Sequence, residues 1–183
     1  IVQKGVDELQ ILKEAGLSRI HVGMESGDDQ VLKRVKKGST SSEQVRAGRM
    51  VKEAGIELSE YMLLGLGGRE LTERHALGSA EAITAIGPDF LRLRTLVPKI
   101  NTLLLHQMRK EKFQVLSPHE VLQETRLFLE NVWCSTRVCS DHYSNYIRIK
   151  GKLPEDQRQM LSDIDRALSW DEARFRPFFI GTQ

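Results

Sequence analysis

Apolar residues recur at helical spacing in three segments, and each segment leads through a glycine into a strand-like run. In the first segment the apolar positions Val6, Leu9, Ile11, Leu12 and Ala15 recur at helical spacing. Gly16 follows, and glycine is the residue that most often terminates a helix. The same order returns at 45–64 around Gly55 and at 81–97 around Gly87. The pattern predicts three consecutive helix–glycine–strand units.

Repeated units of this kind are typical of an α/β fold in which helices cover a parallel sheet. Right-handed crossovers bring the carboxyl ends of all the strands to the same edge of the sheet. In open sheets and in closed barrels alike, that edge is where ligands bind. The residues that follow each predicted strand are therefore the first place to look for a site.

The three strand ends carry polar residues and glycines. The first strand ends at Glu25 and Ser26, the second at Gly65 within the run Gly-Leu-Gly-Gly, and the third at Arg94 and Thr95. We expect these ends to face one pocket, where glycines let the backbone approach a ligand closely. Two simpler interpretations stay open: Glu25 caps the helix that follows it, and the glycine run is only a tight turn.

The pattern changes after Pro98. Amphipathic helices are predicted at 103–113, 117–132 and 154–169, the second with Ser117 as N-cap, Pro118 in its first turn and Glu120 completing a capping box. We expect a boundary near residue 100, with a partial α/β unit at 1–100 and a mostly helical extension at 101–183.

Composition narrows the classes of partner. The 183 residues are 40% apolar and 28% charged, with a net charge of +2 from 27 basic and 25 acidic residues. This balance gives no electrostatic footprint for nucleic acid or an anionic membrane. With no apolar run long enough for a bilayer and no signal peptide at Ile1, the sequence predicts a cytoplasmic protein.

Metal-dependent and hydrolytic chemistry have no motif in this sequence. Cys134 and Cys139 are the two cysteines, five residues apart, which suits neither a disulfide framework nor a zinc site. The five histidines show no zinc-ligand spacing, and no nucleophile elbow is present. The sequence identifies no catalytic residue and no metal ligand.

Two stretches resemble a known family. AGLSRIHVGMESGDDQVLKRVKKGSTSSEQV, followed by EYMLLGLGGRE, resembles the second half of the radical S-adenosylmethionine (SAM) core, in the branch of oxygen-independent coproporphyrinogen oxidase and the methylthiotransferases. The resemblance covers about residues 5–100. From SPHEV onward the chain is similar to the C-terminal extension of an uncharacterised iron–sulfur oxidoreductase group. The resemblance implies the later βα units of a partial parallel (β/α)6 TIM-like barrel with a C-terminal helical extension.

The same resemblance implies that SAM lies across the strand ends. Glu25 and Ser26 match polar positions on its ribose and methionine sides, and Lys37 matches a basic residue that meets its carboxylate. The segment Leu64, Gly65 and Leu66 matches the strand that lines the adenine, and Arg94 at the third strand end completes the expected cofactor-binding set. Two positions depart from the pattern: Tyr61 stands in place of an aspartate, and Gly67 in place of a proline.

A larger departure concerns the iron–sulfur cluster. The CxxxCxxC loop that ligates a [4Fe-4S] cluster in this superfamily is absent from the sequence, and two cysteines cannot replace three thiolates on one loop. We therefore expect a fragment of a radical SAM oxidoreductase that is inactive alone, with an unknown substrate and with exposed strand edges that favour a homodimer. The alternative is a self-standing α/β module that binds a nucleotide or a partner without redox chemistry.

Overall fold

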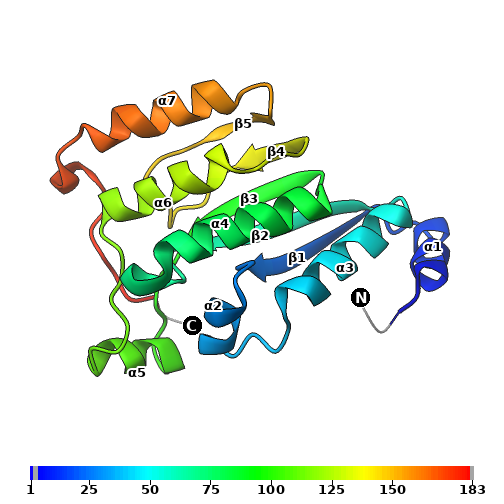
Figure 1. Ribbon diagram of the computed structural model, residues 1–183, viewed down its shortest axis with the longest axis horizontal. Coiled ribbons are helices and arrows are strands. Elements are labelled where there is room, and N and C mark those ends of the chain that lie inside the picture. Colours follow the sequence, from blue (N-terminus) through cyan, green and yellow to red (C-terminus); the bar gives the residue numbers. More distant parts are fainter. Residues whose placement is uncertain (2–3, 182–183) are drawn as a thin grey trace.

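The computed structural model describes residue 1 and residues 4–181, and these residues form one sheet covered by helices (Figure 1). The elements follow in the order α1 (Val6–Glu14), β1 (Arg19–Glu25), α2 (Asp29–Arg34), α3 (Ser41–Glu53), β2 (Glu57–Leu64), α4 (Gly68–Ile86), β3 (Phe90–Thr95), α5 (Leu103–Arg109), α6 (Pro118–Glu130), β4 (Thr136–Cys139), β5 (Lys150–Leu153) and α7 (Gln157–Leu168). A 3-10 turn at Glu172–Arg174 follows α7.

The sheet has five strands in the order β1-β2-β3-β4-β5. Strands β1 to β4 are parallel, and β5 pairs with β4 in the antiparallel direction. The predicted α/β class is therefore confirmed. Because β1, β2 and β3 are parallel neighbours, their carboxyl ends lie at one edge of the sheet, as the sequence predicted.

The three glycines that were expected to end helices have the backbone conformation of a helix C-terminus. Gly16, Gly55 and Gly87 have φ angles of 107°, 71° and 62°. A residue with a Cβ atom is strained in this left-handed region, whereas glycine is not. Each glycine therefore stops its helix and starts the short connection into the next strand.

The main hydrophobic core lies between the sheet and its helices. In Figure 1, α3, α4 and α6 lie across one face of the strands, and α7 packs beside α6 and β5. Leu58 and Met62 of β2 and Leu91 and Leu93 of β3 point into this core and are at most 1% exposed. Alternation along the strands puts the residues between them on the opposite face. On that face Arg94 and Arg137 are exposed.

A smaller apolar cluster lies at the carboxyl edge of the sheet. It consists of buried residues from α2, from the turn after β2, from α4, from the segment after β3 and from the segment after α5, namely Val31, Leu66, Leu71, Leu96 and Phe113. This cluster fixes the loops around the strand ends relative to one another. It therefore supports the region where a ligand site was predicted.

The sheet continues past residue 100. Strand β4 was not predicted, and β5 lies in the segment 140–153, whose sequence pattern allows a loop or a short strand. Both strands join the sheet formed by the first three. The predicted helices of this half are present as α5, α6 and α7, and Ser117 and Glu120 form the predicted capping box of α6. The division of the chain into two domains near residue 100 stays a prediction.

Within residues 4–181, none of the helices combines the length and the apolar character needed to cross a membrane.

Candidate functional site

The first strand ends in a bulge that presents Glu25. The pairing of β1 with β2 shifts register between Gly23 and Glu25, and Glu25 has a φ of 67°. This conformation is uncommon for a residue other than glycine and often marks a functional position. Lys37 reaches back from the segment after α2, so that its Nζ lies 3.1 Å from Oε1 of Glu25.

Asp28, and not Glu25, caps the helix after β1. Its Oδ1 accepts hydrogen bonds from the backbone N–H groups of Gln30 and Val31, each at 3.0 Å. The capping interpretation of Glu25 is therefore wrong, because the cap of α2 is already filled by another carboxylate.

A cavity of about 300 Å³ lies at the ends of the first three strands, and we call it the strand-end cavity. Its lining comes from all three strands: Gly23, Glu25, Tyr61, Met62, Leu63 and Arg94. The guanidinium of Arg94 lies 4.5 Å from the centre of the Tyr61 ring, a cation–π arrangement. Glu25 and Arg94, from the ends of β1 and β3, thus line the same cavity, whereas Ser26, Gly65 and Thr95 are not among its lining residues.

Gly23 keeps part of this cavity open. A Cβ atom at this position would lie 3.3 Å from Oε1 of Glu25 and 3.6 Å from Nζ of Lys37. The glycine therefore leaves room beside an ion pair, and Arg94 adds a second cation to the same space. Such a cavity offers both signs of charge to a zwitterionic ligand.

Ser26 is engaged inside the protein. It is fully buried, and its Oγ lies 2.9 Å from Nδ1 of His75 and accepts the backbone N–H of Asp28 at 3.1 Å. The other ring nitrogen of His75 lies 3.0 Å from the carbonyl of Leu63, so Nε2 is the donor and Nδ1 accepts from Ser26. Burial lowers the pKa of His75 to about 4, which keeps the ring neutral. Ser26 thus ties β1 to β2 and α4, outside the strand-end cavity.

Gly65 is held by a residue that sequence reasoning missed. Its N–H donates to Oε1 of Glu124 on α6 at 2.6 Å, and Thr72 Oγ1 donates to Oε2 of the same carboxyl at 2.5 Å. Burial raises the pKa of Glu124 to about 7, although both hydrogen bonds favour the charged form. The backbone N–H of Gly65 therefore already has an acceptor within the protein.

The remaining residues of the predicted adenine segment lie in apolar surroundings. Leu64 belongs to the main core and Leu66 to the cluster at the strand ends. Gly65 and Gly68 have φ angles of 83° and 62°, and the N–H of Gly68 donates to the carbonyl of Gly65. The glycine run is the tight turn that starts α4. Leu63, one position before Leu64, is the residue that lines the cavity.

A second cavity of about 450 Å³ adjoins the first, and we call it the β3-end cavity. Arg94 and Leu63 line both cavities. The other walls come from the ends of α2 and β2, from the segment after β3, from the start of α5 and from the loop at His142–Ser144. No sequence signal indicated that this loop returns to the strand ends.

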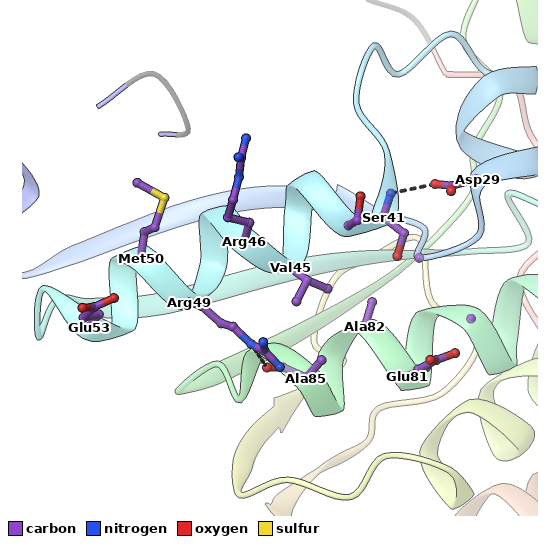
Figure 2. A pocket seen from close by; sticks show the side chains of 13 residues that line it. Asp29, Ser41, Val45, Arg46, Arg49, Met50, Glu53, Glu81, Ala82 and Ala85 are labelled. Carbon is purple, nitrogen blue, oxygen red and sulfur yellow. Dashed lines mark hydrogen bonds between the residues drawn. The ribbon is translucent and has the colours of Figure 1, made fainter. Parts of the chain in front are cut away.

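A third hollow of about 620 Å³ lies between α3 and α4, on the helical side of the sheet (Figure 2). Hydrogen bonds within the fold hold two of its lining groups: Arg49 Nε donates to the carbonyl of Ala85 at 2.8 Å, and the N–H of Ser41 donates to Oδ1 of Asp29 at 2.7 Å. None of the residues that line the strand-end cavity lines this groove.

The two cysteines lie in different surroundings. Both are free thiols, and Cys134 Sγ lies 3.5 Å from the carbonyl of Ile83. Over residue 1 and residues 4–181, no group of three or more His, Cys, Asp or Glu side chains is placed to hold a metal ion.

The chain is an α/β protein with two adjoining cavities at the carboxyl ends of its parallel strands. Residues 3–81 match the Radical SAM superfamily. A search of curated protein sequences gave no match.

Two solved structures resemble the chain. An N-terminally truncated Elp3 of the archaeon Methanocaldococcus infernus aligns over 88% of this chain and 39% of its own, with a TM-score of 0.62 and 16% identity. Methylornithine synthase (PylB) aligns over 92% of this chain and 57% of its own, with a TM-score of 0.51 and 17% identity. The chain thus spans less than two thirds of either structure, and at these identities the likeness shows the fold.

Proposed function

We propose that residues 1–100 are the cofactor-binding half of a radical SAM core, and that SAM binds at the ends of β1, β2 and β3. The observation that carries this proposal is the position of Glu25. It sits at a bulge with a left-handed backbone, is paired with Lys37, and shares a cavity with Gly23 and Arg94.

The residues of the strand-end cavity fit SAM chemically. The methionine part of SAM carries an ammonium and a carboxylate, for which Glu25 on one side and Lys37 and Arg94 on the other are suitable partners. Tyr61 and Leu63 add flat and apolar surface for the adenosine part. Ser26, Leu64, Gly65 and Leu66 act in this proposal through the shape of the strand ends, because their side chains or N–H groups are engaged within the fold.

The residues of this chain do not fit the [4Fe-4S] cluster of the superfamily. The sequence has two cysteines, and such a cluster needs three on one short loop. We propose that the intact oxidoreductase holds its cluster outside this chain and that the chain alone is inactive. When bound, SAM and the cluster supply the radical chemistry, and the residues described here bind and orient the cofactor.

The test is a titration of the 15N-labelled chain with SAM, followed by NMR. We expect weak binding, with chemical-shift changes centred on Gly23, Lys37 and Arg94. Glu25→Ala should weaken binding more than tenfold, about 1.4 kcal/mol, as for loss of a charge-assisted hydrogen bond. Glu57→Gln is the matched control, because Glu57 lies at the opposite end of β2 in an exposed pair with Arg19.

Two results would contradict the proposal. One is a set of shift changes that map away from the strand ends, and the other is an unchanged affinity of Glu25→Ala. Equal binding of adenosine and SAM would instead support the alternative of a nucleotide-binding module, because adenosine lacks the groups that Glu25 and Lys37 are proposed to bind.

We also propose that the chain self-associates. In the described sheet, β1 and β5 each pair with a single neighbouring strand, and an unpaired strand edge favours pairing with another chain. Sedimentation velocity at micromolar concentration should show a dimer. A monomer throughout the concentration series would refute this.

A further inference from the structure

The β3-end cavity has the form of a ligand site with apolar walls. Its volume of about 450 Å³ falls within the range of small-molecule pockets. Half of its lining residues are aliphatic, namely Val35, Leu63, Leu66, Leu96, Val97, Pro98 and Leu104. A ligand that fills it therefore needs a substantial apolar body.

The loop that forms one wall is fixed to β3. The N–H of Thr95 donates to Oγ of Ser144 at 3.2 Å, and Asn145 Nδ2 donates to the carbonyl of Leu93 at 2.9 Å. On the outer side, Arg176 Nε donates to the carbonyl of Ser144 at 2.7 Å. The wall is therefore held in place by the fold itself, which lowers the cost of ordering it around a ligand.

The charge of the cavity is one-sided. Arg94 and Lys99 are its charged lining residues, and none of the lining residues is acidic. Neither side chain forms an ion pair with any residue of the described chain. Two cations that form no ion pair and lie beside apolar walls attract an anion, and a guanidinium binds carboxylate or phosphate in a bidentate manner.

His142 adds a polar group without adding charge. Its Nδ1 lies 2.8 Å from Oγ of Ser144. Burial and the neighbouring charge of Arg94 lower the pKa of His142, so the ring is neutral at pH 7. The cavity thus combines two cations, one neutral imidazole and an apolar floor.

We propose that the β3-end cavity binds the substrate of this protein, and that the substrate is an amphipathic anion whose carboxylate or phosphate group is held by Arg94 and Lys99. Arg94 lines both cavities, so the anion lies directly beside the strand-end cavity. The role as substrate rests on the proposed function, whereas the anion site stands on this geometry alone.

The experiment uses three probes with the same apolar chain: octanoate, octyl phosphate and octylammonium. Each is titrated into the 15N-labelled chain, and affinities are taken from the shift changes of Thr95, Leu96 and Lys99. We expect the anions to bind at least tenfold more tightly than octylammonium. The tighter of the two anions identifies the head group that the cavity selects.

Arg94→Gln and Lys99→Gln should each weaken anion binding several-fold. Lys99 is exposed, so its variant tests the charge even if Arg94→Gln disturbs the packing on Tyr61. Arg137→Gln is the control, an exposed arginine on β4 outside both cavities. Equal binding of octanoate and octylammonium, or full affinity in Lys99→Gln, would overturn the proposal.

Glu25→Ala separates this inference from the proposed function. It should weaken SAM binding more than tenfold and leave octanoate binding unchanged. A chain that binds octanoate through Arg94 and not SAM would keep the anion site and refute the cofactor proposal. A chain that binds SAM but none of the anions would keep the cofactor proposal and refute the anion site.

Discussion

Glu60 lies in the middle of β2 with its carboxyl inside the core, and its titration should control how folding stability depends on pH. Alternation along the strand puts Glu60 on the same side as Leu58 and Met62, both fully buried. Glu60 itself is 2% exposed, and its Oε2 has no hydrogen-bond partner in the described structure. Burial raises the pKa of Glu60 from 4.5 to about 8, against smaller opposing effects of Lys37 and the Met24 backbone.

Folding stability should fall as the pH rises, because the folded protein binds the proton of Glu60 more tightly than the unfolded chain does. Between pH 4.5 and pH 8 the folded protein holds a proton on Glu60 that the unfolded chain has released. Stability from this group is therefore complete below pH 4.5 and is lost as the pH rises toward 8. The loss reaches about 2 kcal/mol at pH 6 and at most about 5 kcal/mol above pH 8, by linkage of the two pKa values.

The assay is urea unfolding followed by circular dichroism at pH 5 to 9, for the wild type and Glu60→Gln. The amide has a similar shape and does not ionise, so the variant should gain stability over the wild type as the pH rises. The control is Glu57→Gln on the same strand as Glu60, where Glu57 forms an exposed ion pair with Arg19 of β1; it should change stability by about 0–1 kcal/mol. Parallel pH profiles of the wild type and Glu60→Gln would refute the reasoning.

Three further predictions follow from contacts at the strand ends. Burial lowers the pKa of His75 from 6.5 to about 4, so its ring should stay neutral from pH 8 down to pH 5 in an NMR titration. The contribution of His75 to folding stability is complete above pH 6.5 and is lost as the pH falls toward 4. A full protonation step at pH 6 to 7 would show that the Ser26–His75–Leu63 contacts are not formed. Glu124→Gln should cost about 1–3 kcal/mol in urea unfolding at pH 8, because the amide nitrogen that replaces one carboxylate oxygen is a donor and leaves either the N–H of Gly65 or the hydroxyl of Thr72 without its acceptor. Stability equal to the wild type would contradict this. Gly27→Ala should destabilise by about 1–3 kcal/mol, since its Cβ would lie 2.4 Å from the carbonyl oxygen of Gly78, whereas Gly5→Ala, with nothing within 4 Å, should unfold at nearly the same urea concentration as the wild type.

Short-range patterns in the sequence were enough to predict the first three parallel strands and the helices that precede them. The alternating run before Glu25 and the terminating glycines at 16, 55 and 87 are short-range features, and each has its expected conformation. The ion pair between Lys37 and Glu25 was not predicted, because the sequence pattern indicated a bound carboxylate as the partner of Lys37.

Features that depend on distant contacts could not be predicted. Strand β4 has four residues, of which only Thr136 and Val138 are buried, too few for a periodic signal. The bond between Ser26 and His75 joins residues 49 positions apart, and that between Gly65 and Glu124 joins residues 59 positions apart. Glu124 reads in the sequence as an ordinary exposed helix position, and only tertiary packing shows that it is buried.

The bond from Gly65 to Glu124 has a consequence for anyone who would shorten or transplant this polypeptide. A chain cut after residue 100 lacks Glu124, the acceptor of the buried N–H group of Gly65, and also lacks β4, the strand that pairs with β3. A graft of the first hundred residues into another barrel would need a replacement carboxylate at the same turn. We therefore expect residues 1–100 to be stable only together with residues 101–183, which supply Glu124 and β4.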